Sequence, residues 1–411
     1  MAKQKIIAAV DIGTSKVAAV ISEMSEGSIR IVGAGLRPSK GVRRGVIVNM
    51  GETVECLREA LDQAETEADV STDGAFVTVG GAYVKGLNSS GSVEIRNRFN
   101  EITSDDVLRA VRKAQEFDFE IPENSRILHV LRRSFAVDGQ EGISDPEGMS
   151  GRVLTAHVHV VLNASTVVSN IVRALNKIDA RAETAVAQQV ASGQAVLSRD
   201  ERELGVVLID IGGGTTDLAV YRQGAIRHTQ SFPVGGSNLT KDVAIGLKTT
   251  LAEAERLKRS AGSVLPDEIP EDDLVQVRQM GSDSKSAVSR QLLCQILRAR
   301  FDEILKHIEQ DLARLELNSE YMTGVVLTGG GSLLEGARQR AQEALGLSVR
   351  GGFPSNVVGA ESDFHHPSYA AVLGLLAYAR EVQFQPERSA LPLPPSAARA
   401  KVKQWLQEKI S

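Results

Sequence analysis

Two glycine-rich stretches of the sequence, residues 8–21 and 208–221, carry residue types that can bind phosphate. Each has an apolar run, then Asp-Ile-Gly with small hydroxyl residues, then a second apolar run with β-branched members. This pattern predicts a β-hairpin with a tight polar turn. Glycine lets the backbone N–H groups of such a turn approach an anion, and a nest of N–H groups binds phosphate oxygens. The predicted phosphate-binding residues are Gly13, Thr14, Ser15, Lys16, Gly212, Gly213, Gly214, Thr215 and Thr216.

Asp11 and Asp210 end the first strand of each predicted hairpin. A carboxylate repels phosphate directly, but it suits Mg²⁺, which binds through a few carboxylates, phosphate oxygens and retained waters. We therefore expect Asp11 and Asp210 to hold a Mg²⁺ ion largely through water. The Lys16 ammonium can neutralise a phosphate oxygen as a point charge.

A third glycine-rich loop, "VVLTGGGSLLEG" at residues 325–336, follows an apolar strand and precedes a helical pattern that begins near Ser332. A helix N-terminus that faces a nucleotide fits this arrangement. A single Asp-Ile-Gly turn is more often an ordinary hairpin with a bulge. Two such hairpins about half a chain apart, together with the third loop, resemble the ASKHA superfamily of actin, Hsp70 and sugar kinases. The resemblance implies that ATP and Mg²⁺ lie between two related halves.

The overall composition is that of a soluble globular protein, with 42% hydrophobic and 24% charged residues among 411. Lysine and arginine number 47 against 52 acidic residues, a net charge of −5, so we expect no nucleic-acid partner. Cys56 and Cys294 have no metal-ligand spacing and predict free thiols in a reducing compartment. The apolar run before Asp11 is too short for a signal peptide, and the sequence predicts a cytosolic protein.

The elements that must position the loops follow an α/β pattern. From residue 6 to residue 84, predicted strands alternate with one helical segment, Thr53–Ala68. Residues 85–165 shift to polar strand and helix pieces and predict an inserted subdomain. A mainly helical pattern from residue 236 to residue 300 predicts a second inserted unit.

The C-terminal region combines a linker with an amphipathic segment. Residues 385–398 are proline-rich and predict a partly extended linker. In residues 399–411, one stripe of a predicted helix carries Val402, Trp405, Leu406 and Ile410, and four basic residues accompany one acidic residue. We expect this helix to lie in an anionic membrane surface. The alternative is a terminal helix that docks on the protein's own surface.

Beyond the phosphate loops, the chain resembles the FtsA family, the actin-like membrane tethers of the bacterial division ring. The stretches that carry the resemblance span essentially the whole chain: "SKGVRRGVIVN", "RILHVLRRSFAVDGQEGISDPEGMSG", "DERELGVVLIDIGGGTTDLAVY", "AERLKRSAG" and the terminal helix. The resemblance implies an α/β, actin-like fold with two related halves around a nucleotide cleft and an FtsA-type subdomain 1C in place of actin subdomain 1B. The implied subdomains are 1A (residues 1–84, 166–193 and 359–384), 1C (85–165), 2A (194–235 and 301–358) and 2B (236–300).

The same resemblance implies site residues and partners. Glu255 and Lys258 would face the ribose and adenine, and the adenosine side would be cradled by Gly329, Gly330, Gly331 and Ser332. Arg300 matches a family arginine that binds the C-terminal peptide of FtsZ; from spacing alone it could equally pair with Glu303 on its own helix. The implied function is an ATP-binding protein that polymerises and tethers FtsZ filaments, with other division proteins, to the cytoplasmic face of the inner membrane at the division site.

At positions 188 and 189 this sequence has Gln188 and Gln189, where many members of the family have Glu-Pro. In actin-like proteins this segment orients the attacking water, which makes Gln188 the candidate for that role. A glutamine can hold a water by hydrogen bonds but cannot accept its proton as a carboxylate can. We therefore expect at most a weak ATPase, with ATP acting mainly as a structural ligand.

Three other interpretations have less support. An ASKHA-type small-molecule kinase would need a catalytic aspartate in a sugar pocket, and no segment between the hairpins looks like one. An actin-fold adaptor like PilM would share the core but would not be expected to end in the amphipathic tail. His157 and His159 alternate on a predicted strand, but two ligands without a third do not make a convincing zinc site.

Overall fold

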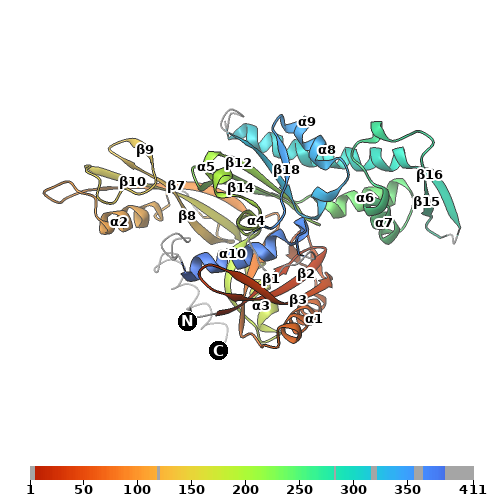
Figure 1. The fold of residues 1–411 in the computed structure, drawn as a ribbon, viewed down its shortest axis with the longest axis horizontal. Helices are drawn as coiled ribbons and strands as arrows, with labels where there is room; N and C mark the ends of the chain where they lie inside the picture. Colours follow the sequence, from red (N-terminus) through yellow and green to blue (C-terminus); the bar gives the residue numbers. More distant parts are fainter. Residues whose placement is uncertain (1–4, 118–120, 282–283, 316–321, 356–363, 385–411) are drawn as a thin grey trace.

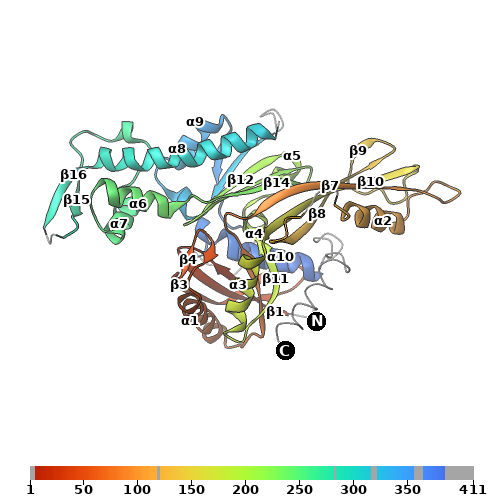
Figure 2. The ribbon, with the colours of Figure 1, turned by 180° about the vertical axis from the view of Figure 1, so that it is seen from behind.

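The computed structural model describes residues 5–117, 121–281, 284–315, 322–355 and 364–384. Two β-sheets lie one above the other, with helices between them and on their outer sides (Figure 1 and, from behind, Figure 2). Within these ranges, none of the helices has the length and apolar character needed to cross a membrane.

The first sheet has five strands in the order β11-β6-β1-β2-β3. Residues of β1 alternate between its two faces. Val10 packs with the outer helices α1 and α3, whereas Ala9 packs with α4 and α10. Helix α1 begins earlier than the sequence predicts because the Asn49 side chain accepts a hydrogen bond from the Glu52 backbone N–H and caps it. The bounds are β1 Lys5–Ile12, β2 Lys16–Met24, β3 Ile29–Pro38, β6 Gly74–Val79, β11 Arg181–Ala187, α1 Met50–Ala68 and α3 Ser165–Asn176.

The second sheet has nine strands in the order β18-β17-β12-β13-β14-β7-β10-β8-β9. Its first five strands carry the second hairpin and the third glycine loop, and their outer face packs against α6, α8 and α9. Strands β12 and β17 are parallel, which brings the ends of both strands to the same edge of the sheet. The bounds are β12 Val206–Ile211, β13 Thr216–Arg222, β14 Ala225–Phe232, β17 Gly324–Thr328, β18 Val349–Gly351, α5 Arg199–Leu204, α6 Gly236–Gly246, α8 Arg290–Arg314 and α9 Ala337–Leu345.

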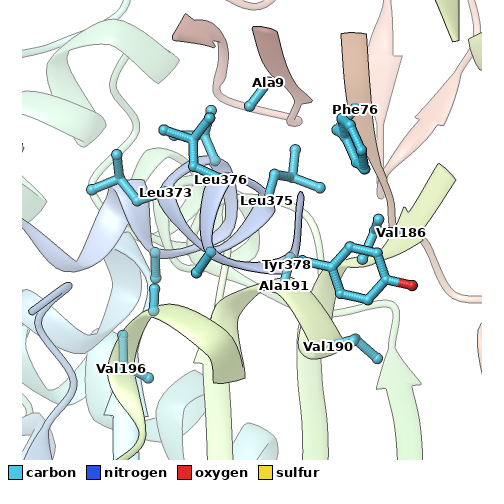
Figure 3. Packing of buried hydrophobic residues seen from close by; sticks show 14 of the residues in the cluster. Ala9, Phe76, Val186, Val190, Ala191, Val196, Leu373, Leu375, Leu376 and Tyr378 are labelled. Carbon is cyan, nitrogen blue, oxygen red and sulfur yellow. The ribbon is translucent and has the colours of Figure 1, made fainter. Parts of the chain in front are cut away.

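Helices α4 (Gln188–Val196) and α10 (Ala370–Phe384) fill the space between the two sheets. Figure 3 shows Leu375 and Leu376 of α10 directed toward Ala9 and Phe76 of the first sheet. The two helices approach so closely that a Cβ added to Gly374 would overlap the carbonyl oxygen of Ala191. Only glycine leaves room for this backbone contact.

An inserted unit extends the second sheet on one side of the molecule (Figure 1). Its strands β7, β10, β8 and β9 continue from β14 through a single register pair, Gln230 with Lys85. Helix α2 packs on this part of the sheet and begins at a capping box formed by Thr103 and Asp106. The bounds are β7 Lys85–Glu94, α2 Ser104–Ala114, β8 Ser125–Val137, β9 Gln140–Ile143 and β10 Val153–Ala164.

The opposite end of the molecule holds a second group of short elements around α6 and α8. Helix α8 runs without a break through Arg300, where the sequence places a subdomain boundary; the predicted subdomain limits stay predictions. The remaining bounds are α7 Leu251–Ala261, β15 Leu274–Arg278, β16 Lys285–Ser289, β4 Val42–Arg43 and β5 Val46–Ile47, with short 3-10 turns at Pro266–Glu268, Gly330–Leu333 and Pro367–Tyr369.

Candidate nucleotide cleft

Both predicted hairpins form, and their turns have the same hydrogen bond. Strand β1 pairs with β2 and strand β12 with β13, each antiparallel. In the first turn the Gly13 N–H donates to the Lys16 carbonyl at 3.0 Å, and in the second the Gly212 N–H donates to the Thr215 carbonyl at 2.9 Å. The sequence repeat therefore corresponds to a repeat of backbone geometry.

The two turns face each other across the molecule and touch. A Cβ added to Gly213 would overlap the Ser15 hydroxyl, and one added to Gly214 would overlap the Thr14 hydroxyl. Glycine is thus required at both positions of the second turn because the first turn fills the space. The sequence did not reveal this contact, since the two turns are about two hundred residues apart.

A short hairpin, β4 with β5, closes one side of this contact. The Gly45 N–H donates to Thr14 Oγ1 at 3.0 Å, and the Arg44 backbone N lies 2.9 Å from the position of a Cβ added to Gly214. Arg44 has a positive φ of 49°. The stretch that contains Arg44 and Gly45 carries part of the family resemblance, but no role in the site was predicted for either residue.

The two carboxylates are buried and each is held by a hydroxyl group. Thr78 Oγ1 donates to Asp11 Oδ1 at 2.6 Å, and Ser192 Oγ donates to Asp210 Oδ2 at 2.5 Å. Burial raises the pKa of Asp210, and the like charge of Asp11 raises it further, although Ser192 and Gln188 donate to it. A cation bound between the two carboxylates would relieve this repulsion.

The donor set fits a hydrated Mg²⁺ ion better than a protein cage. Among the described residues, no group of three or more His, Cys, Asp or Glu side chains could hold a metal ion. Mg²⁺ commonly keeps several waters and takes its other ligands from one or two carboxylates and from phosphate oxygens. Asp11 and Asp210 would supply those carboxylates.

A third buried carboxylate, Asp217, was not predicted from the sequence; it pairs in register with Asp210 on the neighbouring strand. It accepts hydrogen bonds from the Ser231 hydroxyl and from Thr215 Oγ1, the latter at 3.0 Å. Burial, followed by the charge of Asp210, raises the pKa of Asp217 to about 7. Its place directly after Thr216 in the glycine-rich motif was the available signal.

A cleft of about 1050 Å³ opens beside the two turns. Its walls include both glycine turns, Asp11, Asp210, Gln188, Glu255, Lys258, Gly329, Gly330 and Gly331, so most of the predicted site residues meet there. Thr216 and Ser332 do not line it. The Thr216 hydroxyl donates to the Val234 carbonyl at 2.9 Å and the Ser332 hydroxyl to the Gly329 carbonyl at 2.7 Å, so each holds a loop in shape.

Glu255 and Lys258 form one hydrogen-bonded group on the cleft wall. Lys258 Nζ lies 2.6 Å from Glu255 Oε2, 2.9 Å from Thr240 Oγ1 and 3.1 Å from the Gly236 carbonyl. Burial alone would raise the pKa of Glu255, but hydrogen bonds from Lys258 and Thr240 outweigh it, and the pKa is lowered. The carboxylate is therefore ionised and able to accept hydrogen bonds.

Two features of the cleft differ from the sequence prediction. Helix α9 begins at Ala337 and not near Ser332, because Gly336 has a φ of 78° that interrupts the helix; a 3-10 turn faces the cleft instead. Lys16 Nζ donates to the Ser368 carbonyl and lies 5.0 Å from the centre of the Tyr369 ring. The turn His366–Tyr369 is therefore a wall of the cleft.

The other predicted residues lie away from the cleft. Arg300 on α8 binds Asp242 on α6, with Nε 2.5 Å from Oδ2, and also pairs with Glu303. His159 is buried and bonds to Asn88 and Thr229, so no metal role is indicated for it. The predicted membrane residues Val402, Trp405, Leu406 and Ile410 are outside the described residues, as is the linker 385–398.

Comparison with solved structures identifies the fold. The chain resembles the PilM-PilN type IV pilus biogenesis complex with a TM-score of 0.62, at 16% identity, covering 91% of this chain and 98% of that chain. It resembles MreB5 of Spiroplasma citri bound to ADP with a TM-score of 0.56, at 14% identity, covering 94% and 99%. At such identities the likeness concerns the fold alone, and the predicted actin-like fold is confirmed.

Comparison of sequences identifies the family. The family model described as "Cell division protein FtsA" matches residues 207–374, and "SHS2 domain inserted in FTSA" matches residues 81–162. The chain is 38% identical to the cell division protein FtsA of Pseudomonas aeruginosa over 380 residues, covering 92% of this chain and 90% of the relative. It is 36% identical to that of Neisseria meningitidis serogroup B, covering 98% and 99%. The chain therefore belongs to the FtsA family of actin-like cell division proteins.

Proposed function

We propose that this protein binds ATP and Mg²⁺ between its two halves and acts in cell division as a scaffold that links FtsZ filaments to the inner membrane. The observation that carries the nucleotide part is the contact between two equivalent glycine turns, each next to a buried aspartate at the edge of one cleft. Exposed N–H groups in such turns suit phosphate oxygens, and the paired carboxylates suit Mg²⁺.

The cleft chemistry supports a nucleotide ligand more than an efficient hydrolase. Gln188 Nε2 lies 3.5 Å from Asp210 Oδ2, at the start of the helix that also carries Ser192. From there the amide can hold a water near the phosphates, but it cannot take the proton of that water. Hydrolysis would be slow at most, and bound ATP would mainly fix the two halves relative to each other.

The FtsZ-binding part of the proposal assigns the C-terminal peptide of FtsZ to Arg300. Its guanidinium already makes two hydrogen bonds to Asp242, with Nη2 3.2 Å from Oδ1, and it is about a quarter exposed. A guanidinium fork can bind carboxylates on two sides, so a carboxylate of an acidic peptide could replace Glu303, which pairs with Nη1. Arg300 would then both join α6 to α8 and bind the partner.

The membrane part of the proposal depends on the C-terminal sequence. Each fully buried aliphatic side chain contributes about 1.5–3 kcal/mol, an upper limit at an interface. Each basic residue near an anionic surface adds about 1 kcal/mol. Folding a short helix opposes both, so one tail binds weakly. Head-to-tail assembly into filaments would gather many tails on one surface, and avidity would make the attachment firm.

The nucleotide site predicts the effect of Gly213→Asp. This change forces a side chain against Ser15 and places a carboxylate beside the phosphates, so ATP affinity measured calorimetrically with Mg²⁺ should fall at least about tenfold. Gly27→Asp is the matched control, since nothing lies within 4 Å of a Cβ at Gly27. Equal ATP affinity in both variants would rule out phosphate binding at these turns.

The FtsZ assignment predicts opposite effects on peptide binding when Arg300 or Asp242, which form one ion pair, is substituted. Arg300→Gln should weaken binding of the FtsZ tail peptide about tenfold, because a charge-assisted hydrogen bond is lost. Asp242→Asn frees the guanidinium and should keep or strengthen that binding. Fluorescence anisotropy with a labelled tail peptide measures both, and thermal unfolding checks that each variant folds. Wild-type binding by Arg300→Gln would remove Arg300 from the site.

The membrane assignment predicts that Trp405→Glu and a chain ending at Pro395 fail to co-sediment with anionic liposomes, while both keep ATP binding. Gln404→Glu is the matched control, because it makes the same charge change on the opposite side of the predicted helix. Undiminished liposome binding by the shortened chain would mean that the tail is only a docked terminal helix.

Head-to-tail assembly predicts that lipid-bound wild-type protein sediments as polymers in the presence of ATP. Monomers at every protein concentration would contradict assembly.

A further inference from the structure

Two buried side chains of the inserted sheet reach the edge of the nucleotide cleft. His129 lies on β8, and Asn163 lies on β10, the strand that pairs with β8. His129 Nε2 accepts a hydrogen bond from the Ala187 backbone N–H at 3.0 Å. Asn163 Nδ2 donates a hydrogen bond to the Gly80 carbonyl at 3.0 Å. The inserted unit therefore holds two backbone groups that belong to the first sheet or directly follow it.

These two backbone groups lie where neighbouring strands end side by side. Ala187 is the last residue of β11 and pairs in register with Val79, the last residue of β6. The residues that follow, Gln188 and Gly80, both line the cleft. A Cβ added to Gly80 would lie 3.4 Å from Gln188 Oε1, so the Gly80 backbone is beside the Gln188 side chain. A displacement of either strand end would therefore move the Gln188 amide.

The hydrogen bond to His129 also fixes the start of helix α4. Ala187 is the N-cap residue, and its methyl group cannot cap the helix as the Asn49 side chain caps α1. In a capping box, the N–H of the N-cap residue is bound by the side chain three residues further on, which in α4 is the apolar Val190. His129 supplies the missing acceptor from another strand.

The surroundings of His129 keep its ring neutral and fix its orientation. A backbone N–H can only donate, so Nε2 is the acceptor and the proton of the neutral ring is on Nδ1. Burial lowers the pKa of His129 to about 4, so the ring is uncharged at neutral pH. The ring packs edge-on against Tyr378 of α10, with the ring centres 5.7 Å apart. His129 is therefore a fixed acceptor between β8, β11 and α10.

The beginning of α4 carries two side chains that contact the site. Gln188 Nε2 lies 3.5 Å from Asp210 Oδ2, and Ser192 Oγ donates to the same oxygen at 2.5 Å. Because each residue of a helix has a fixed rise and rotation from the one before it, the point where α4 begins determines where both side chains lie.

We propose that His129 is a positioning residue that holds the start of α4, so that Gln188 can orient the water that attacks bound ATP. This inference rests on the proposed nucleotide site. The reaction forms a bond from the water oxygen to the terminal phosphorus and breaks the bond from that phosphorus to ADP. The proton of the water passes to solvent, because the Gln188 amide cannot accept it. A misplacement of about 1 Å can lower such a rate by about a hundredfold.

The test measures ATP turnover by the full chain at saturating ATP and Mg²⁺. His129→Phe keeps a ring against Tyr378 but removes the acceptor, so turnover should fall at least about tenfold. ATP affinity measured calorimetrically should stay within about twofold, because the glycine turns are unchanged. His129→Gln can place an amide oxygen near the position of Nε2 and should restore most of the turnover.

His159→Phe is the matched control for His129→Phe. It makes the same change at another buried histidine of the inserted unit, which bonds to Asn88 and Thr229 and does not line the cleft. Its turnover should stay within about twofold of wild type, because distant sites act independently.

Two further measurements separate a positioning role from a purely structural one. In a Gln188→Ala background, adding His129→Phe should change turnover by less than about twofold, whereas a general loss of stability would lower turnover equally in both backgrounds. In the ligand-free protein, hydrogen exchange at residues 186–192 should be at least about tenfold faster in His129→Phe and close to wild type in His129→Gln. If His129→Phe does not fold, His129→Asn replaces it, because the shorter amide does not reach Ala187.

The possible failures are distinguishable. Turnover and hydrogen exchange in His129→Phe equal to those of wild type would overturn the inference, as would wild-type protein that binds ATP without measurable turnover. Equal losses in both Gln188 backgrounds, or an equal loss in His159→Phe, would also overturn it. Wild-type protein that does not bind ATP would contradict the proposed function itself, and the inference with it.

Discussion

Two turns from opposite halves of the fold touch each other, and this contact constrains the rest of the structure. Because Gly213 and Gly214 lie against Ser15 and Thr14, the two sheets can be neither farther apart nor rotated without opening the contact. The layer of α4 and α10 sets the same separation, down to the backbone contact at Gly374. A ligand that binds both turns would therefore fix the position of one half of the molecule relative to the other.

The site is also joined to elements far from it. Helix α4 places the Ser192 hydroxyl in hydrogen-bond contact with Asp210, and Ala191 of the same helix packs on α10. One helix therefore contributes both to the site and to the core. On the other side of the turn, Asp217 accepts a hydrogen bond from Ser231 on β14. The same strand continues into the inserted sheet through its pairing with β7. The inserted unit thus contacts the second half through β7, whereas its chain connections, from β6 to β7 and from β10 to α3, run to the first half.

Local patterns in the sequence predicted the parts of the site that lie within one stretch of chain. The two Asp-Ile-Gly hairpins and the third glycine loop are of this kind, and the actin-like fold followed from their repetition. Thr78 and Ser192 could not be predicted, because a lone hydroxyl on a strand or helix gains its role only when the fold brings it to a carboxylate. The start of α9 was misplaced for a local reason, the positive φ of Gly336.

The central claim is that ATP and Mg²⁺ bind to both turns at once and hold the halves together. Hydrogen exchange measured by mass spectrometry tests this most directly, because it follows the backbone N–H groups that would bind phosphate. We predict that ATP with Mg²⁺ slows exchange in both Gly13–Lys16 and Gly212–Thr216, and that Mg²⁺ alone slows neither. Protection of only one turn, or of neither, would contradict the account.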